Sequence, residues 1–196
     1  MKRVLLINHY AGSPKMGMEY RPWLMAKRWR AMGFTVTIIA ATNSHVRSVQ
    51  PKIEKTMDCE NIEGVDYVWI KTSAYSGNGI ARLKNILMFV GKLLYFSKKI
   101  ATLFKPDVVI ASSTYPLDIY PAKKIANFVD ARLLFEVHDL WPLSPIELGG
   151  MSRFNPFIVL CQLAENYAYK NSEMGKQSRI TLFQNNFGRS TYSNRR

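Results

Sequence analysis

The sequence predicts an α/β fold built on a doubly wound parallel sheet. Short apolar runs without a period of two alternate with longer stretches of helical periodicity, a pattern typical of strands that are covered on both faces and linked by helices. Two of the runs, 4–8 and 133–137, open directly into loops with polar residues, one of them glycine-containing. Because ligands bind beyond the carboxyl ends of the strands in such sheets, these loops are the first place to look for function.

The chain has 196 residues, 47% of them hydrophobic and 21% charged, which is enough for one well-buried core. Several segments are short, apolar and rich in β-branched side chains, as buried strands are. The strands expected on this basis are 3–8, 34–41, 65–72, 107–111 and 132–137. The polar stretch 42–64 is expected to hold at most short strands or a helical turn.

Proline and glycine mark the ends of the expected helices. Pro22 stands at a first helical position and Gly33 just past a last one, the usual asymmetry of helix termini. A long helix has to stop before Pro106, because the residue ahead of a proline disfavours helical backbone. The expected helices are 23–32, 80–104, 118–129 and 154–170.

We predict one domain over residues 1–172 and an irregular basic tail over 173–196. After residue 172 the order of elements calls for another apolar strand, yet the sequence that follows is polar and without sustained periodicity apart from 180–183. We interpret this end of the chain as a truncated reading frame with a frameshifted or spurious terminus.

The net charge of +13 is concentrated in two places. Seven basic residues and no carboxylate lie between positions 71 and 105, and five basic residues and no carboxylate follow Glu173. Charge confined to one helix and one tail indicates a local surface with a local partner rather than a general affinity for polyanions.

Other features exclude several classes of protein. Cys59 and Cys161 lack the spacing of metal ligands or of a C-x-x-C redox site, which predicts reduced bystander thiols. No stretch reaches the roughly 18 to 20 uncharged apolar residues that a membrane span needs, and the first residues contain no signal-peptide cleavage site. We therefore expect a cytoplasmic protein.

The loop 8–19 is a candidate site for a phosphate or a sugar. Gly12, Ser13 and Gly17 let backbone amides approach such a group, and the helix that follows adds positive potential at its N-terminus. The spacing is not G-x-G-x-x-G and no acidic residue follows the second strand, so a dinucleotide site is not expected. The alternative is a strand-to-helix turn that needs glycine for its geometry alone.

His138 and Asp139 follow the last predicted strand. A histidine at this position can act as a general base when another group fixes its tautomer, whereas a lone histidine is more often structural. Adjacent residues on an extended chain point in opposite directions, so Asp139 is expected to shape the loop rather than to pair with His138. His9 is a further candidate for the same cleft, and His45 is expected at the surface.

The predicted helix 80–104 carries Lys84, Lys92, Lys98 and Lys99 on one narrow stripe, and large apolar residues cover the rest. Because only one side of a helix packs on a sheet, so wide an apolar arc favours contact with an anionic membrane or a lipid-linked substrate. The alternative is a core helix with a solvated lysine edge.

Three motifs, 7–14 (INHYAGSP), 17–22 (GMEYRP) and 135–142 (FEVHDLWP), resemble the amino-terminal domain of glycosyltransferase family 4, close to the bacterial fucosamine-transferase-like branch. The resemblance covers about residues 2–172. It implies one half of a GT-B fold, in which two Rossmann-like domains face each other across a cleft. The nucleotide-sugar donor is then held mainly by the second domain and the acceptor mainly by the first.

The chain also departs from this family. Complete members are about twice as long, and their E-x7-E motif lies in the carboxyl-terminal donor domain, which these residues do not include. His138 falls where many members carry a cleft histidine, although the fucosamine-transferase-like branch often has arginine there.

The resemblance implies roles for the candidate residues. Gly12 and Ser13 would shape the cleft floor, Arg21 would meet a phosphate of donor or acceptor, and His138 would meet the sugar hydroxyls. Gly17 and Asp139 are further substrate-binding candidates. The implied reaction is metal-independent and retaining, needs no cofactor beyond the nucleotide-sugar substrate, and builds a surface polysaccharide on a lipid-linked acceptor. We expect the chain to be inactive alone and to sit peripherally on the inner face of the plasma membrane.

Two other functions stay open from the sequence. A non-catalytic module that binds an anionic lipid or another protein would also explain the basic helix. A nucleic-acid partner is disfavoured, because the basic stripe lacks interleaved exposed aromatic residues and no recognised motif accompanies it.

Overall fold

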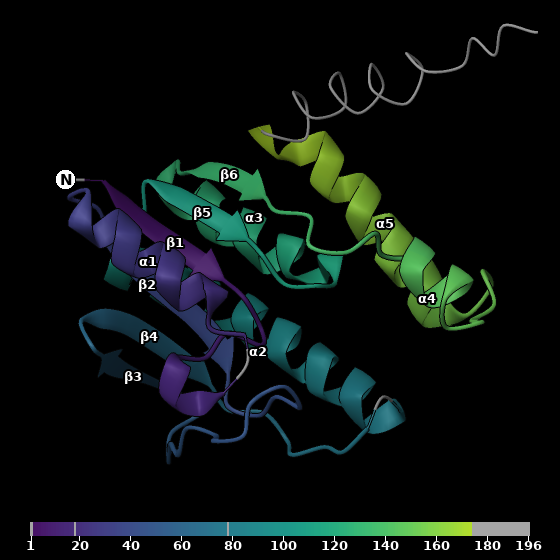
Figure 1. Ribbon diagram of the computed structural model, residues 1–196. Helices are drawn as coiled ribbons and strands as arrows, with labels where there is room; N and C mark the ends of the chain where they lie inside the picture. The colour runs from purple at the N-terminus through teal and green to yellow at the C-terminus, as the bar shows by residue number, and fades with distance from the viewer. Residues whose placement is uncertain (1, 18, 78, 174–196) are drawn as a thin grey trace, which may run out of the picture.

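The computed structural model describes residues 2–17, 19–77 and 79–173 (Figure 1). Six strands form one sheet in the order β3-β4-β2-β1-β5-β6. All neighbouring strands are parallel except β3 and β4. The strands are β1 Arg3–Ile7, β2 Thr35–Ala41, β3 Met57–Ile62, β4 Val65–Ile70, β5 Val108–Ala111 and β6 Arg132–Phe135.

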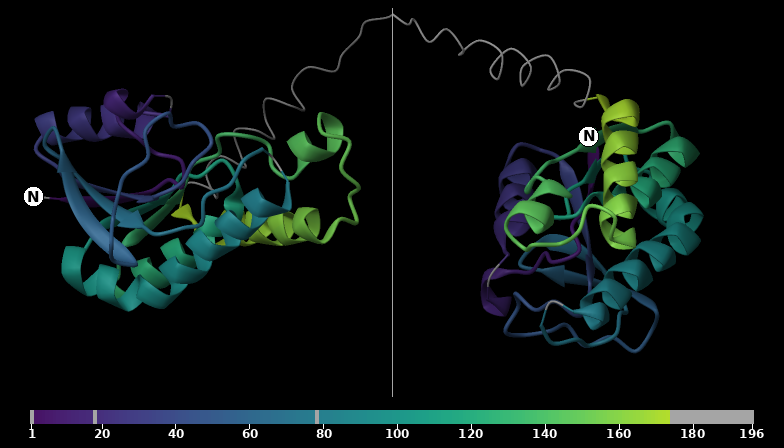
Figure 2. Two further views of the ribbon diagram at one scale, coloured as in Figure 1. Left: turned by 90° about the horizontal axis from the view of Figure 1, so that it is seen from below. Right: turned by 90° about the vertical axis from the view of Figure 1, so that its right-hand side faces the viewer.

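Helices cover both faces of the sheet. They are α1 Arg21–Ala31, α2 Ile80–Phe104, α3 Ile119–Val129, α4 Leu143–Glu147 and α5 Pro156–Asn171, with short 3-10 turns η1 Pro14–Met16 and η2 Pro116–Asp118. In the left view of Figure 2, α1 lies on one side of the strands and α2 and α3 on the other. This arrangement confirms the predicted Rossmann-like fold, with a mostly parallel six-stranded sheet.

Alternation along the strands divides the core into two parts. Leu5 and Ile7 of β1 pack with the helices α2, α3 and α5, whereas Val4 and Leu6 pack with Trp23 of α1. Both sides of β1 are therefore apolar, which explains why its sequence shows no period of two.

The order of the parallel strands places a crevice at their carboxyl ends. From the central strand β1 the chain first builds outward through β2 and β4, then returns to the other side of β1 for β5 and β6. In open sheets the switch between these two directions is where ligands bind, because the loops there diverge. Here that point lies beyond the carboxyl ends of β1 and β5.

The stretch 42–64, for which at most short strands or a helical turn are predicted, contains the six-residue antiparallel strand β3. Residues Glu63 and Gly64 form the turn to β4 with positive φ angles of 50° and 86°. The edge strand has exposed polar residues, as edges that avoid aggregation do, and its sequence therefore looks like a loop. The short helix α4 was not expected.

Helix starts shift by a few residues. Helix α1 begins at Arg21 rather than at residue 23, so this side chain projects from the first turn. Helix α5 begins at Pro156 rather than at residue 154, because Asn155 caps it by accepting a hydrogen bond from the Phe157 amide at 2.9 Å. The bounds 80–104 of α2 are as predicted.

Apart from Glu173, the predicted irregular tail 173–196 lies outside the described residues. The Glu173 carboxylate lies 2.6 Å from Nη2 of Arg132 at the start of β6. Within the described part of the chain, no helix is both long and apolar enough to cross a membrane. Cys59 is exposed and Cys161 is buried, and both are free thiols, as predicted.

Candidate functional site

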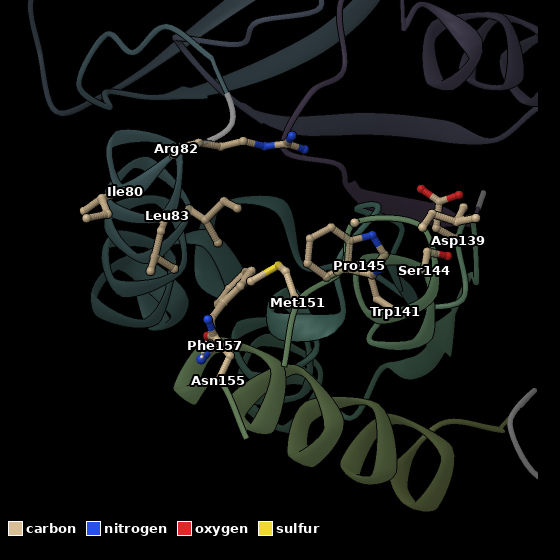
Figure 3. Close-up of a pocket in the computed structure, with 14 residues that line it drawn as sticks. Ile80, Arg82, Leu83, Asp139, Trp141, Ser144, Pro145, Met151, Asn155 and Phe157 are labelled. Atoms are coloured by element: carbon tan, nitrogen blue, oxygen red, sulfur yellow. Dashed lines mark hydrogen bonds between the residues drawn. The ribbon is translucent and has the colours of Figure 1, made fainter. Parts of the chain in front are cut away.

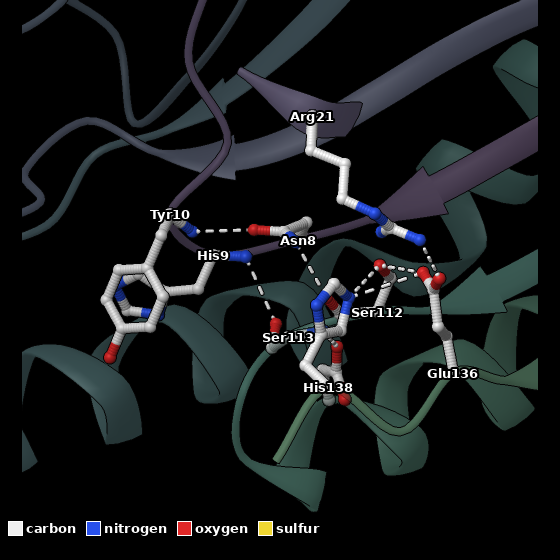
Figure 4. Close-up of polar contacts among 9 residues, drawn as sticks. Asn8, His9, Tyr10, Arg21, Ser112, Ser113, Glu136 and His138 are labelled. Atoms are coloured by element: carbon white, nitrogen blue, oxygen red, sulfur yellow. Dashed lines mark hydrogen bonds and ion pairs between the residues drawn. The ribbon is translucent and has the colours of Figure 1, made fainter. Parts of the chain in front are cut away.

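Polar side chains gather at the carboxyl edge of the sheet, where the strand order switches direction (Figure 4). They come from three neighbouring strands and from the first turn of α1. The residues that follow β1, β5 and β6 and carry these side chains are Asn8, His9, Ser112, Ser113, Glu136 and His138.

Glu136 is the centre of this group. Its Oε1 accepts a hydrogen bond from Arg21 Nη2 at 2.5 Å, and its Oε2 accepts one from the Ser112 hydroxyl at 2.7 Å. Nε2 of His138 lies 3.3 Å from the same Oε2 and 3.0 Å from the Ser112 hydroxyl oxygen. We call Arg21, Ser112, Glu136 and His138 the Glu136 cluster. Figure 4 shows their side chains converging on one carboxylate.

The hydrogen bonds of the Glu136 cluster perturb its titration. Partial burial alone would raise the pKa of Glu136, but hydrogen bonds from His138, Arg21 and Ser112 outweigh it and hold that pKa well below its usual range. The hydrogen bond to Glu136 raises the pKa of His138 above 6.5, against the opposing effect of burial. The cluster therefore favours an ionised carboxylate beside a protonated imidazole.

Local backbone geometry explains this pairing. The Glu136 amide donates to the Ala111 carbonyl at 2.9 Å, so the extended backbone of β6 continues one residue past the strand. Residues two apart on an extended chain point the same way, which brings His138 and Glu136 together. Asp139 instead lines a cavity that contains none of the cluster residues in its wall (Figure 3). His138 thus pairs with Glu136, which is not among the predicted site residues. Its spacing of two from His138 is the feature of the sequence that indicates the pair.

Arg21 reaches the cluster because α1 starts close to the carboxyl end of β1. Its guanidinium side chain is about half exposed, at 52%, so the ion pair with Glu136 forms at the surface of the crevice. The hydrogen bond to Glu136 raises the pKa of Arg21 further. Arg21 and the N-terminus of α1 thus place positive potential beside the Glu136 carboxylate.

The glycine loop is closed by contacts within the protein. The Gly12 amide donates to the Glu19 carbonyl at 3.0 Å, and the Gly12 carbonyl accepts from the Tyr67 hydroxyl at 2.7 Å. A side chain at Gly12 would place its Cβ 2.9 Å from Arg47 Cδ. These contacts are consistent with the alternative that the strand-to-helix turn needs glycine at position 12 for its geometry alone.

Ser13 and Gly17 have different roles in this loop. Ser13 is buried, and among the described residues its hydroxyl has no hydrogen-bond partner. Gly17 has φ 96° and ψ −141°, a conformation open essentially to glycine alone. The binding roles predicted for the two residues remain predictions.

The buried Arg47 side chain holds the loop 8–19 against the end of β2 and is not among the predicted site residues. Its Nη1 and Nη2 donate to the carbonyls of Ala11 and Ala41, and its guanidinium lies 5.1 Å from the ring centroid of Trp69. Burial lowers the pKa of Arg47 to about 10. Within the described residues no carboxylate lies at ion-pair distance, so carbonyl dipoles and an aromatic face stabilise the charge.

His9 is fully buried and does not line the surface of the crevice, contrary to its candidacy there. Its Nδ1 lies 2.5 Å from the Tyr115 hydroxyl, and burial lowers the pKa of His9 to about 3, which keeps the imidazole neutral. His45 is exposed, as expected, with Nδ1 2.8 Å from the Tyr75 hydroxyl.

Hydrogen bonds below the crevice fix the loops that carry the cluster. Asn8 Nδ2 donates to the Ser112 carbonyl at 2.6 Å, and the His9 amide donates to the Ser113 hydroxyl at 3.0 Å. The Ser113 amide in turn donates to Asp118 at 2.9 Å. Burial raises the pKa of Asp118 to about 7. The strands β1 and β5 are therefore locked together directly beneath the Glu136 cluster.

The lysines of α2 divide into two kinds. Lys84, Lys98 and Lys99 are exposed, whereas the ammonium group of Lys92 donates to the Lys71 carbonyl at 2.5 Å. Much of the apolar arc that favoured a membrane contact packs in the core. The buried apolar residues of α2 are Ile86, Phe89, Val90, Leu93, Ile100 and Ala101.

Some apolar side chains of α2 do remain at the surface. Ile80 is 85% exposed, Tyr95 83%, Leu103 58% and Leu87 45%. Among the described residues, no group of three or more histidine, cysteine or acidic side chains is arranged to hold a metal ion.

No family model matches the sequence, and no curated protein matches it either. Solved structures show weak likenesses. The C-terminal domain of a hydrogenase from Pyrococcus furiosus aligns over 69% of this chain and 91% of its own, with 16% identity and a TM-score of 0.42. An E. coli trehalose-6-phosphate synthase, a GT-B glycosyltransferase solved with UDP-2-fluoro glucose, aligns over 83% of this chain but 38% of its own, with 8% identity and a TM-score of 0.45. At these values neither likeness assigns the chain to a family.

Proposed function

We propose that this chain is the acceptor-side domain of a retaining glycosyltransferase, which transfers a sugar from a nucleotide-sugar to the hydroxyl of a lipid-linked acceptor. The observation that carries the proposal is the Glu136 cluster, with Arg21 and His138 held on one carboxylate at the switch point of a Rossmann-like sheet. The motifs of the family 4 resemblance contribute three of its four residues, Arg21, Glu136 and His138.

The cluster suits the charges that develop in such a transfer. The acceptor hydroxyl oxygen bonds to the anomeric carbon, and the bond from that carbon to the donor phosphate breaks. The phosphate leaves with the electron pair of that bond, and its oxygen takes the proton that the acceptor hydroxyl loses. Arg21 lies at a helix N-terminus, so it can hold a phosphate group. Donors fixed before reaction stabilise developing negative charge without reorganisation.

His138 is placed to meet sugar hydroxyls. Its Nε2 faces Ser112 and Glu136, and this contact orients the ring and leaves Nδ1 for the substrate. Because the pKa of His138 is raised, the imidazolium persists to a higher pH than in an unpaired histidine and donates a hydrogen bond from Nδ1. Glu136 acts through His138 and Arg21 and is a positioning residue.

Transfer by a restored two-domain protein tests the proposal. The resemblance assigns donor binding to a second domain, so the chain alone should transfer no sugar from any nucleotide-sugar, whereas the chain joined to a matching donor domain should. Robust turnover by the 196-residue chain alone, or none by any joined protein that folds and binds donor, contradicts the proposal.

A second candidate function is binding of an anionic membrane without catalysis. It is favoured by the exposed face of α2, where Lys84 and Lys98 lie among Ile80, Leu87 and Tyr95. Basic side chains interleaved with exposed apolar ones are typical of helices that lie in a membrane interface. Both functions are compatible with a peripheral position on the cytoplasmic face of a membrane.

A further inference from the structure

A cavity of about 790 Å³ lies beside the Glu136 cluster, between the first turns of α2, the helix α4 and the start of α5 (Figure 3). Its volume is within the usual range for small-molecule sites in proteins. Apolar side chains from three separate elements form most of its wall. The largest of them are Leu83, Ile86, Trp141, Met151 and Phe157.

The charged groups of the cavity lie on one side. Figure 3 shows Arg82 and Asp139 on the side nearest the sheet, while Leu83, Met151 and Phe157 lie on the other side. Asn155 also lies on that other side, where its side-chain oxygen accepts a hydrogen bond from the Phe157 amide. Arg82 is held in place because its Nε and Nη2 donate to the Tyr10 hydroxyl at 3.2 and 3.1 Å. Asp139 directly follows His138, so the polar side of the cavity adjoins the candidate site.

Apolar side chains also surround the mouth of the cavity. Leu148 and Ile80 line it and are 89% and 85% exposed, and Leu140 and Leu143 nearby are 59% and 50% exposed. Exposed apolar side chains gathered beside a cavity are unfavourable in water and are typical of sites that bind apolar groups. The cavity therefore offers a largely apolar chamber and mouth, with its charged residues on the side nearest the sheet.

We propose that this cavity binds the apolar chain of the acceptor, a single prenyl or acyl chain whose polar end passes Arg82 and Asp139 toward His138. That the bound molecule is a sugar acceptor rests on the proposed function. That the cavity binds a prenyl or acyl chain does not. A ligand apolar along one end and polar at the other matches the distribution of groups in the wall. A flat bilayer surface would instead meet side chains that point outward from a helix, as on the exposed face of α2.

Monomeric amphiphiles of graded length test the assignment. Titration calorimetry of the full chain with n-alkyl β-glucosides from hexyl to nonyl, each below its micelle concentration, should show the Kd falling about fourfold per methylene, the value expected for about 0.8 kcal/mol per buried CH₂. Methyl glucoside should give no measurable heat. The uncharged headgroup keeps the lysines of α2 out of the measurement.

Variants that fill the cavity give a matched comparison. Leu83→Trp and Met151→Trp each add volume to a half-buried wall position and should abolish the dependence on chain length, with unchanged circular dichroism. Leu103→Trp places the same side chain at an exposed position of α2 outside the cavity and should keep the parent's dependence.

Several outcomes overturn the assignment. One is a Kd that does not change with chain length, and another is full chain-length dependence in both cavity variants. Sedimentation with phosphatidylglycerol vesicles that is lost in Leu83→Trp, without binding of any monomeric glucoside, would identify a bilayer as the occupant instead. Chain-length-dependent binding without transfer by the two-domain protein would refute the proposed function alone, and transfer without such binding would refute the cavity assignment alone.

Discussion

Glu136 and His138 form a pair in which one carboxylate oxygen lies 3.3 Å from Nε2 of the imidazole, with the Ser112 hydroxyl bridging the two. The pair lies at the carboxyl end of β6 and is about a fifth exposed, with 26% of the Glu136 side chain and 16% of the His138 side chain accessible. Partial burial strengthens the electrostatic interaction, yet the imidazole stays accessible from the crevice. The same contact both orients the imidazole ring of His138 and raises its pKa.

Removal of the carboxylate should release the histidine. In Glu136→Gln we expect the pKa of His138 to fall relative to the parent, because the hydrogen bond to the Glu136 carboxylate is the largest cause of its raised value. An NMR titration of the imidazole Cε1–H signals measures this. His45 is the internal control, since its pKa is lowered by burial and it contacts Tyr75 rather than Glu136. An unchanged His138 titration would contradict the pairing.

The same pair predicts a window of pH for its contribution to stability. Because the pKa of His138 is raised on folding, its contribution to stability is fully present below about pH 6.5, the unfolded-state pKa. That contribution is lost as the pH rises through the folded-state pKa. The depressed pKa of Glu136 means that its contribution is present above about 4.5 and is lost as the pH falls below that. Glu136→Gln should therefore reduce the free energy of unfolding most between about pH 4.5 and 6.5, by about 1 to 2 kcal/mol.

Denaturant unfolding of the parent and Glu136→Gln across this range is the measurement. Asp139→Asn serves as a control, because Asp139 is an exposed carboxylate in the same loop that lines the cavity instead. A stability difference that is flat from pH 4 to 9 would show that the pair contributes through packing rather than charge.

His138 should matter for turnover and little for the fold. In the two-domain protein, His138→Ala should lower kcat by roughly 10²-fold or more, the loss expected for a positioned acid, base or hydrogen-bond donor. The matched variant His45→Ala removes a histidine that is exposed and bonded to Tyr75, and should retain the parent's rate. Thermal melts followed by circular dichroism accompany the assay. Loss of the fold in His138→Ala, or full activity, would favour a structural histidine.

The sheet could be predicted from the sequence because its strands are buried on both faces and separated by well-punctuated helices. The bounds and pairing of the edge strand β3 could not, since its exposed polar residues have the composition of a loop and its pairing with β4 depends on a turn at Glu63 and Gly64. Helix α4 is too short for a periodic signal. Each of these elements is specified by tertiary contacts more than by local pattern.

The candidate site was predictable in part for a similar reason. His138 stands out because it follows an apolar strand, whereas Glu136 lies within the predicted strand 132–137 and its partner Arg21 lies 115 residues away. Arg47 gave no signal at all, because a lone arginine in a polar stretch is normally solvated. Its burial depends on carbonyl groups of Ala11 and Ala41 that only the fold brings together.

The glycines of the loop 8–19 serve either ligand binding or the geometry of the turn, and the second alternative can be tested by stability measurements. Gly17 has a backbone conformation that other residues essentially never adopt, and an added Cβ would lie 2.8 Å from Ser48 Oγ. Gly17→Ala should lower the free energy of unfolding by about 2 to 4 kcal/mol, combining backbone strain with the clash. Gly33→Ala isolates the strain, because Gly33 also has a positive φ but nothing within 4 Å of an added Cβ, and it should cost about 1 to 2 kcal/mol.

Urea denaturation compares the two variants directly. Gly12→Ala belongs in the same series, since its added Cβ would meet the flexible Arg47 side chain and should cost less than Gly17→Ala. Equal costs for Gly17→Ala and Gly33→Ala would rule out a role for the Ser48 contact.

The exposed lysines of α2 provide the test of membrane binding. Each of Lys84, Lys98 and Lys99 should add about 1 kcal/mol of attraction near an anionic surface, so neutralising all three to glutamine should weaken sedimentation with phosphatidylglycerol vesicles by about two orders of magnitude. The effect must fade between 0.1 M and 1 M salt, where the Debye length falls from about 10 Å to about 3 Å. Lys92→Gln is the matched control, because the Lys92 ammonium group already donates to the Lys71 carbonyl, and its loss should change binding less than that of any exposed lysine.

The basic residues that follow Glu173 are present in every one of these variants, so differences between the variants report on α2 alone. Lipid binding that is equal in the parent and the triple variant would assign the attraction to those residues and remove α2 as a membrane contact. Binding that is lost in the triple variant and retained in Lys92→Gln would place the membrane on the face of α2 that also carries Ile80, Leu87 and Tyr95. The cavity mouth at Ile80 would then open toward the same membrane, so that an acceptor chain could enter it from the lipid phase.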